Sequence, residues 1–388
     1  MAGTDEGVAP LRLACVLGTR PEAIKLAPIV LAARESPARF AMTVIATGQH
    51  GQMAASALAQ FGLTADLDLH VMEINQRPTD VIARTLLALP AAFEHVRPDA
   101  VLVQGDTSST FAGAIGAYHE KIPVGHVEAG LRTNDIYSPF PEEMNRRLVS
   151  VLSSFHFAPT DLARRRLLAE AIPGDRVLVS GNTVVDALRR LRTTAAPPAG
   201  VSVSAATRMI LLTCHRRENH GERMDDICRA VREIVEARGD VTVVCPVHPS
   251  PLVAPRMRAA LGRVERVTLL EPVGYAELLW LMEASTLVLT DSGGLQEEAP
   301  AFNKPVLVLR DVTERPEGID AGVARLVGTD RATIVRETLR LLDDEREYRR
   351  MAGGANPYGD GRASERILTF LLAHVGVRRA ASAVLARE

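Results

Sequence analysis

The sequence has little of what would mark several common classes of protein. Lysine occurs only at Lys25, Lys121 and Lys304, so nearly all positive charge is carried by arginine. The formal net charge of −2 gives no long-range field that would attract nucleic acid or an anionic membrane. No apolar run reaches the roughly 18 residues that a membrane-spanning helix needs. The composition thus predicts neither nucleic-acid nor membrane binding, and an anionic ligand must be held by local arginines and helix ends.

Cysteine and histidine patterns that would bind metal are also missing. Cys15, Cys214, Cys228 and Cys245 form no CxxC pair, and the histidines form neither an HxH nor an HExxH set. Buried, reduced thiols and no metal site are therefore expected. The acidic stretch Met1–Pro10 lacks the apolar run of a signal peptide. These features predict a cytoplasmic protein.

Three nucleotide and hydrolase fingerprints are absent as well. The sequence contains no G-x-G-x-x-G dinucleotide motif, no G-x-x-x-x-G-K-[ST] phosphate loop and no G-x-S-x-G nucleophile elbow. NAD chemistry, P-loop hydrolysis and serine esterase chemistry therefore have no support in the sequence. No cofactor is expected.

What the chain does contain is a regular alternation of short apolar runs and amphipathic segments of helical length. In the first half the predicted strands are Leu11–Leu17, Met42–Ala46, Ala100–Val103, Ile122–Val124, Phe155–Ala158 and Arg176–Val179. In the second half they are Met209–Thr213, Val241–Cys245, Val267–Leu270, Leu287–Thr290 and Val306–Leu309. Strands that alternate with helices predict an α/β fold with parallel sheets covered on both faces.

A length of 388 residues favours two domains. The stretch Thr193–Thr207 is rich in Pro, Ala, Gly and Ser and is typical of a linker. We therefore expect one doubly wound domain over residues 1–192 and a second over 208–356. Residues 357–388 begin with a polar turn, followed by a helix from about Arg362 to Val375 that packs back on the first domain. A two-half protein of this kind normally binds its ligand in the crevice at the strand ends.

The segment Gly125–Arg147 carries the densest set of reactive groups. It is too polar and too rich in Gly and Pro for a core segment. Its acids, histidine and cations are Glu128, Asp135, Glu142, Glu143, His126, Arg132, Arg146 and Arg147. Ordering a long irregular segment is costly, so such a segment usually builds a site. A solvated charged loop is the alternative.

Two more polar loops follow predicted strands in the first half. Gly18–Lys25 is a strand-to-helix turn whose free N–H groups attract anions, with Arg20 and Lys25 as cations that can face the same anion. The alternative is a plain turn with surface cations. Asp106 follows the strand that ends at Val103, and it either caps the next helix or carries a carboxylate into the cleft. The two roles can coexist.

The second half repeats this arrangement. His215–Glu218 combines a histidine with paired arginines at a strand end, which suits a diphosphate, although a capped helix start is the alternative. Arg310–Glu317 is another strand-end loop with cations.

The stretch Thr290–Glu298 is a sharper phosphate signal. Ser292, Gly293 and Gly294 open a helix whose N–H groups can hold phosphate. Glu298 then lies one turn into the helix, where it can accept hydrogen bonds from a ribose diol. The alternative is that the acids only stabilise the helix dipole.

Together these stretches resemble the non-hydrolysing UDP-N-acetylglucosamine 2-epimerases. The matching motifs are GTRPEAIKLAP, QGDTSSTF, PVGHVEAGLRT, YSPFPEEMNR, GNTVVDAL, HRRENHGE, PVHPSP, TDSGGLQEEAP, RDVTERPEGI and NPYGDGRASERI, in this order over nearly the whole chain. The resemblance implies a GT-B-like fold, with two Rossmann-like halves, a cleft between them and UDP held mainly by the C-terminal half. It also implies a homodimer, a UDP-sugar substrate and no nicotinamide.

The implied reaction is reversible C2 epimerisation of UDP-GlcNAc to UDP-ManNAc, a step that can feed polysaccharide biosynthesis. Because the C2 proton is unactivated, the route is elimination of UDP to 2-acetamidoglucal and re-addition. Two faces of C2 call for more than one acid/base group, and a departing diphosphate calls for cations. The alternatives are a hydrolysing relative that releases ManNAc and UDP, a GT-B glycosyltransferase, and a UDP-sugar sensor.

The resemblance also carries roles over to particular residues. The implied catalytic residues are Asp106, Glu128, Glu142 and His215. The implied substrate-binding residues are Arg20, Lys25, Arg217, Ser292, Gly293, Gly294, Glu298 and Arg315. Some relatives are activated by UDP-GlcNAc beside the active site, and the matching residues here are Gln49, Gln52, Glu142 and His248, with Arg77 as the candidate arginine.

Overall fold

The chain forms two compact units. The structure, a computed structural model, describes residues 9–49, 51–73, 76–192, 195–201 and 206–376. Unit 1 is formed by residues up to Arg190 and from Gly359 onward, and unit 2 by Leu191–Tyr358. Of the expected linker, residues 193–194 and 202–205 lie outside the described residues, and the described part from 195 to 201 contains neither helix nor strand.

Unit 1 is built on a seven-stranded sheet. All of its strands pair in parallel, in the order β3-β2-β1-β4-β5-β6-β7. The strands are β1 (Leu11–Leu17), β2 (Phe40–Ala46), β3 (Leu67–Asp68), β4 (Ala100–Gln104), β5 (Val124–Val127), β6 (Phe155–Ala158) and β7 (Val177–Val179). The strand order reverses between β1 and β4, and in doubly wound sheets ligands bind beside such a switch point, at the carboxyl ends of the strands.

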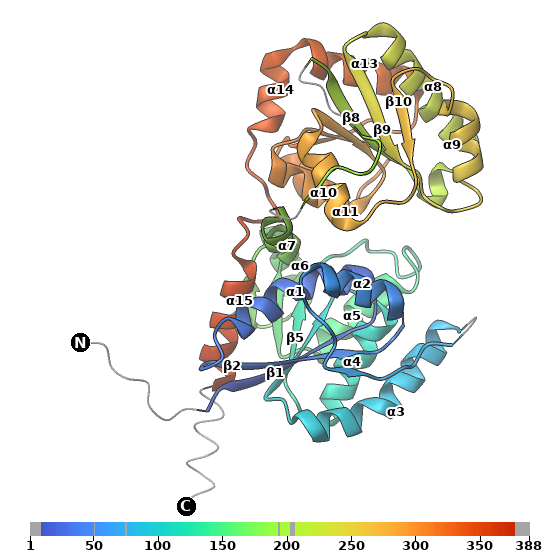
Figure 1. Cartoon of the computed structure of the whole chain (residues 1–388). Coiled ribbons are helices and arrows are strands. Elements are labelled where there is room, and N and C mark those ends of the chain that lie inside the picture. Colours follow the sequence, from blue (N-terminus) through green and yellow to red (C-terminus); the bar gives the residue numbers. More distant parts are fainter. Residues whose placement is uncertain (1–8, 50, 74–75, 193–194, 202–205, 377–388) are drawn as a thin grey trace, which may run out of the picture. The chain divides into compact units, whose positions relative to one another are not determined.

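Helices cover both faces of this sheet (Figure 1). They are α1 (Arg20–Arg34), α2 (Gly51–Gln60), α3 (Pro78–Val96), α4 (Ser108–His119), α5 (Glu142–Leu152), α6 (Asp161–Ala169), α7 (Thr183–Leu191) and α15 (Ala363–Leu371). Helix α1 packs against α2 and α15, whereas α4 packs against α3 and α5 on the other face. Crossovers on opposite sides of the switch point thus place α1 and α4 so that both begin at the same edge of the sheet.

Unit 2 repeats this design with six parallel strands, in the order β10-β9-β8-β11-β12-β13. The strands are β8 (Arg208–Thr213), β9 (Val241–Pro246), β10 (Val267–Leu270), β11 (Leu287–Thr290), β12 (Val306–Val308) and β13 (Ala324–Leu326). The helices are α8 (Glu222–Ala237), α9 (Ala254–Leu261), α10 (Tyr275–Ala284), α11 (Gly293–Glu298), α12 (Pro316–Asp320), α13 (Arg331–Asp343) and α14 (Glu345–Ala352). The predicted α/β class, with two doubly wound halves, is confirmed.

One predicted strand was misplaced. The expected strand Ile122–Val124 is instead Val124–Val127, so Gly125 and His126 belong to the sheet and not to the loop that follows. A Cβ on Gly125 would lie 2.7 Å from Leu102 Cδ2, so the glycine allows close packing of neighbouring side chains in the core. Strands β3 and β13 were not predicted, because they are only two and three residues long and are partly exposed.

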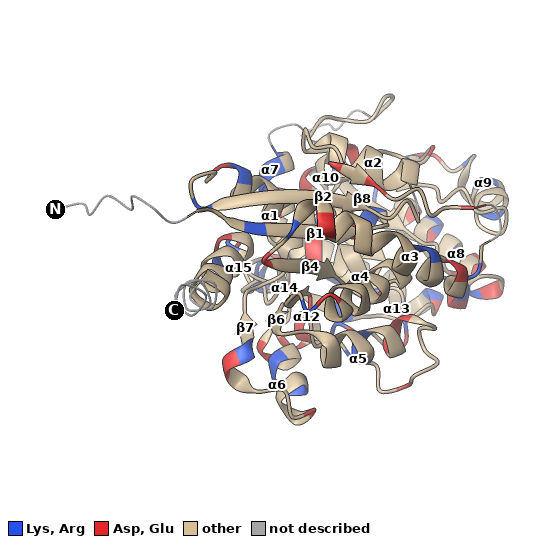
Figure 2. Ribbon diagram, turned by 90° about the horizontal axis from the view of Figure 1, so that it is seen from below, with Lys and Arg blue, Asp and Glu red and all other residues tan. Residues whose placement is uncertain are grey.

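Charged side chains are spread over both units. Basic and acidic segments alternate along many of the helices (Figure 2). With the net charge of −2, this leaves no single-sign field of long range. Among the residues described, no helix is both long and apolar enough to cross a membrane.

The C-terminal segment is fastened to unit 1 by a buried aspartate. Asp186 in α7 accepts hydrogen bonds from the backbone N–H groups of Ala363, at 3.1 Å, and Ser364, at 2.8 Å. These donors belong to the first turn of α15, where a helix has no internal partners for them. The predicted helix Arg362–Val375 is observed as α15 followed by a π-helical turn over Leu372–Gly376.

We predict that Asp186→Ala loosens α15. Two buried N–H groups would lose their acceptor, which costs about 1–3 kcal/mol for each unsatisfied group. Amide hydrogen exchange in a peptide that covers α15 should therefore rise by about tenfold or more. Asp360→Ala is the control, because Asp360 pairs with Arg366 at the surface and such pairs contribute under about 1 kcal/mol. Equal amide hydrogen exchange in the two variants would contradict the role of Asp186 in holding α15.

Candidate functional site

Glu128 is the centre of a polar network in unit 1. It follows β5 directly, and its side chain is held by residues from three other segments. Its Oε1 accepts hydrogen bonds from the Lys25 ammonium and, at 3.0 Å, from Asn182 Nδ2, while its Oε2 accepts from Gln104 Nε2. The glutamate is only 9% exposed. The carboxylate is thereby fixed in one orientation at the carboxyl edge of the sheet.

The backbone of Glu128 is strained. Its φ of +66° lies in the left-handed region, which few residues other than glycine adopt. Such a conformation costs on the order of 1–3 kcal/mol and persists only where surrounding contacts fix it. The hydrogen bonds from Lys25, Gln104 and Asn182 supply this constraint. Strain held in this way is common at functional sites.

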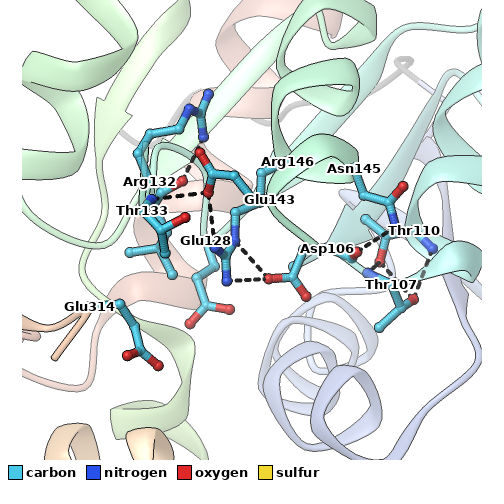
Figure 3. A network of polar contacts seen from close by, with 12 residues as sticks. Asp106, Thr107, Thr110, Glu128, Arg132, Thr133, Glu143, Asn145, Arg146 and Glu314 are labelled. Atoms are coloured by element: carbon cyan, nitrogen blue, oxygen red, sulfur yellow. Dashed lines mark hydrogen bonds and ion pairs between the residues drawn. The ribbon is translucent and has the colours of Figure 1, made fainter. Parts of the chain in front are cut away.

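Asp106 lies at the end of the neighbouring strand β4. Arg146 from α5 binds its carboxylate at 2.7 Å and also reaches Glu143 at 3.2 Å (Figure 3). Burial raises the pKa of Asp106, the Arg146 charge opposes this rise, and the negative charges of Glu128 and Glu142 add to it. Asp106 is therefore an acid with increased proton affinity beside two other carboxylates.

The suggestion that Asp106 caps the next helix is wrong. Thr107 is the N-cap of α4, and its hydroxyl accepts a hydrogen bond from the Thr110 N–H group at 3.2 Å. The Asp106 side chain is thus left for Arg146. Of the two roles considered for Asp106, only the carboxylate that projects beyond its strand remains.

Glu142 opens α5 on the same edge of unit 1. Its Oε2 is buried and has no hydrogen-bond partner among the described residues. Its charge acts on Asp106, so the two carboxyl groups are near each other. A buried polar atom without a protein partner is uncommon in native structures and calls for an explanation. A bound ligand would provide one.

The turn that follows β1 differs from its prediction. The N–H groups of Gly18 and Thr19 were expected to attract an anion, but both donate to Glu22 Oε2, at 2.6 and 2.7 Å. A side chain of α1 thus takes the place that the anion was expected to fill. Arg20 and Lys25 remain as cations of this turn, and Lys25 is paired with Glu128.

The candidates for a regulatory pocket in unit 1 lie in different surroundings. The Gln49 carbonyl accepts from the Ser109 N–H group, at 3.2 Å, and hydroxyl, at 2.7 Å, so this side chain lies at the start of α4. Gln52 is exposed on α2. Arg77 is exposed and pairs with Asp80 at 3.0 Å at the start of α3. Gln49 thus contacts the first turn of α4, which follows the strand that carries Asp106.

In unit 2 the corresponding organising group is Asp291, after β11. Its Oδ2 accepts from the N–H groups of His215 and Arg216, both at 2.9 Å, and from Asn219 Nδ2 at 3.0 Å. Its Oδ1 lies 3.2 Å from His215 Nδ1. Burial alone would raise the pKa of Asp291, but the interactions with His215 and the backbone N–H groups outweigh it and lower the pKa to about 2.

His215 and His248 are stacked. Their ring centroids are 5.5 Å apart and the planes differ by 17°. Burial and the neighbouring His215 lower the pKa of His248. Arg217, by contrast, is exposed in a 3₁₀ turn over Arg217–Asn219. The alternative to a diphosphate site at His215–Glu218 was the capped start of a helix. The structure has a short 3₁₀ turn there instead.

Arg315 is held among acids in unit 2. Its Nε lies 2.7 Å from Glu297 and its Nη1 lies 2.6 Å from Glu314. Burial would raise the pKa of Glu314, but Arg315 and Arg310 outweigh it and lower the pKa to about 2. A Cβ on Gly293 would lie 2.9 Å from Arg315 Cζ, so a side chain there would displace the guanidinium.

The remaining candidates of unit 2 lie on α11. Gly293 and Glu298 are buried in this helix, whereas Ser292 and Gly294 are half-buried at its start. The Ser292 N–H group donates to Thr290 Oγ1 at 2.9 Å, so it is not free for phosphate. Glu298 is the last residue of this helix.

Several residues of these networks were not identified from the sequence. They are Glu22, Gln104, Asn182 and Asp291. Each lies within a motif that was recognised; Glu22 binds the turn just before it, whereas the roles of Gln104, Asn182 and Asp291 depend on partners far along the chain. No group of His, Cys, Asp and Glu in the described part of the chain has the geometry of a metal site.

Comparison with known proteins adds an independent observation. Residues 32–372 match the UDP-N-acetylglucosamine 2-epimerase family. A UDP-N-acetylglucosamine 2-epimerase of Salmonella typhimurium is 47% identical over 370 residues, which cover 93% of this chain and 98% of that protein.

Solved structures agree. The UDP-GlcNAc 2-epimerase of Neisseria meningitidis bound to UDP-GlcNAc has a TM-score of 0.86 and 42% identity, covering 94% of this chain and all of that one. The enzyme of Methanocaldococcus jannaschii in complex with UDP-GlcNAc and UDP has a TM-score of 0.77 and 34% identity, at 94% and 100% coverage. This likeness confirms the predicted GT-B-like fold class. The chain therefore belongs to the UDP-N-acetylglucosamine 2-epimerase family, as its motifs predicted.

Proposed function

We propose that this protein is an enzyme that interconverts UDP-GlcNAc and UDP-ManNAc by inverting C2 of the sugar, without hydrolysis and without a redox cofactor. The observation that carries the proposal is the set of three neighbouring carboxylates in unit 1, Asp106, Glu128 and Glu142. Membership of the epimerase family supports the choice of substrate.

The proposed reaction has two steps. A carboxylate removes the C2 proton, the C1–O bond to UDP breaks, and the electron pair of the C–H bond becomes the C1=C2 bond of 2-acetamidoglucal. UDP leaves with the electron pair of the C1–O bond. A carboxylic acid then delivers a proton to the other face of C2, and a phosphate oxygen of UDP re-forms the bond to C1. Atoms and charges balance without any oxidant.

The surroundings of the carboxylates fit such proton transfers. A base must be ionised and an acid must hold its proton near neutral pH, so their proton affinities have to be tuned. Burial raises the pKa of Asp106 and moves it toward the acid role. Lys25 and Asn182 stabilise the ionised form of Glu128, because both donate to its Oε1.

Unit 2 supplies the proposed UDP site. His215 is held by Asp291, and Arg217 is exposed in the adjoining turn. Ser292, Gly293, Gly294, Glu298 and Arg315 complete the proposed contacts to the nucleotide, with Arg20 and Lys25 of unit 1. A departing diphosphate carries negative charge that cations and N–H groups stabilise. Gln49, Gln52, Arg77 and His248 stay predictions for a second, activating UDP-GlcNAc.

The experiment that tests the proposal is NMR of the purified protein with UDP-GlcNAc in D₂O. We expect UDP-ManNAc with deuterium at C2 and no free sugar. Free ManNAc with UDP would identify a hydrolysing enzyme and contradict the non-hydrolysing reaction. An unchanged spectrum would contradict epimerisation of this substrate and leave a transferase or a UDP-sugar sensor.

We predict that Asp106→Asn lowers kcat by about 10²–10⁴-fold, the usual contribution of a positioned acid or base. Glu128→Gln should lower it comparably. Asp135→Asn is the matched control, because Asp135 is an exposed acid of the same polar segment. Steady-state kinetics at pH 7 measure all three. Wild-type turnover in the Asp106 variant would remove this residue from the mechanism.

We further propose that the protein is a cytoplasmic homodimer. All four cysteines are free and buried, which suits a reducing compartment. On helices α3, α4 and α5, which pack side by side, Leu87, Tyr118 and Val151 expose 83%, 58% and 80% of their surface. We propose that these side chains, exposed on neighbouring helices, form the dimer interface.

We predict that Leu87→Asp combined with Val151→Asp produces monomers, because buried charges would oppose association. Light scattering after gel filtration measures the mass. The matched control is Val312→Asp, which changes a 71% exposed valine of unit 2 and should leave the dimer intact. An unchanged mass in the double variant would rule out this face.

A further inference from the structure

Asn182 lies between the Glu128 carboxylate and the chain segment that begins at Gly359. This residue follows β7 and is only 2% exposed. Its Oδ1 accepts from the Val184 N–H group at 3.0 Å, in the position that caps α7. A backbone N–H group can only donate, so this bond fixes the amide orientation and directs Nδ2 toward Glu128, 3.0 Å away. The cap of α7 thereby determines where one donor to Glu128 lies.

The adjacent Gly181 is in close contact with the segment that returns from unit 2. A Cβ on Gly359 would lie 3.1 Å from Gly181 Cα and 3.5 Å from the Asn182 nitrogen. Five residues later the same segment is bound to α7 again, because Asp186 accepts from the Ser364 N–H group. The returning segment therefore contacts α7 at its start and within its length.

On its other side this segment is fastened to a candidate loop of unit 2. Tyr358 is buried, and its hydroxyl accepts from the Gly318 N–H group at 3.2 Å and lies 3.5 Å from the Arg315 carbonyl oxygen. The next residue, Gly359, begins the second chain segment of unit 1. Two consecutive residues thus contact the loop that carries Arg315 and the turn that carries Asn182.

We propose that Asn182 is a positioning residue for the reaction, through which the returning segment at Gly359 sets the orientation of the Glu128 carboxylate. The proposal rests on the proposed function of Glu128 as an acid/base group. In this role Asn182 acts through Glu128 and not on the substrate directly. It transmits the position of the Gly359 backbone to a carboxylate whose own backbone is strained and is therefore sensitive to the loss of any one donor.

Two substitutions at Asn182 separate positioning from folding. Asn182→Ser keeps an oxygen that can cap α7 but removes the donor to Glu128. We expect kcat to fall by about tenfold to a hundredfold, as for other small displacements of reacting groups, with KM within about twofold. Asn182→Asp keeps the cap and places a carboxylate where the donor was.

The aspartate variant has a signature that a merely structural role lacks. Like charges raise the pKa of neighbouring carboxyl groups, so the acid limb of the kcat profile should move to higher pH by about one unit. The other titratable groups close enough to act on Glu128 include Lys25, Asp106 and His126, and all three remain unchanged in this variant. An unmoved acid limb together with wild-type kcat for Asn182→Ser would overturn the proposal.

A pair of glycines tests the contact with the returning segment. Gly359 and Gly361 both have positive φ, +123° and +73°, so an alanine is strained at either. Only at Gly359 does the new Cβ meet the backbone of Gly181, whereas at Gly361 it meets the side chain of Arg189. We expect Gly359→Ala to lower kcat at least about tenfold more than Gly361→Ala, with similar melting temperatures. Equal kcat values in the two glycine variants would contradict the link between the Gly359 backbone and Glu128.

The wild-type protein in the same assay separates a failure of the proposed function from a failure of the positioning role. If it does not epimerise UDP-GlcNAc, the proposed function fails. If it does, and the Asn182 and Gly359 variants match it in kcat and pH profile, only the positioning role fails.

Discussion

The left-handed backbone at Glu128 is the constraint on which the candidate site of unit 1 depends. A glutamate adopts a φ of +66° only when several contacts hold it there. The contacts come from Lys25 after β1, Gln104 at the end of β4 and Asn182 after β7. Strand ends far apart in sequence must therefore be in register before the carboxylate has its orientation. A parallel sheet with a switch point provides this, because all its strands end at one edge.

In each unit a buried acid accepts hydrogen bonds from the N–H groups of a turn that follows a strand. Such N–H groups are therefore not free to bind an anion, although the sequence alone suggested that they were. Glu22 accepts the N–H groups of Gly18 and Thr19, and Asp291 accepts those of His215 and Arg216. These N–H groups look free in the sequence, but carboxylates of the protein itself occupy them. These two sets of N–H groups are therefore not available to an anion, whereas the His215 ring lies 3.2 Å from Asp291 Oδ1.

Sequence reasoning was most successful where the signal is local. Strands β1, β6, β10 and β11 have the predicted bounds, because their apolar runs are short and bounded by turn residues. The error at β5 arose because Gly125 and His126 looked like loop residues, although both are buried in the sheet. The role of Asn182 could not be predicted, because a hydrogen bond to a residue 54 positions away follows from the strand order and not from neighbouring residues.

Two neighbouring carboxylates of unit 1, Asp106 and Glu143, differ in the direction of their pKa shift. Arg146 binds both Asp106 and Glu143. For Glu143, burial alone would raise the pKa, but donors from Thr133, Arg146 and Arg147 outweigh it and lower the pKa. For Asp106 burial prevails over Arg146, and the pKa rises. Donors thus lower the proton affinity of Glu143, whereas burial raises that of Asp106. One arginine therefore pairs with two nearby acids whose pKa values are shifted in opposite directions.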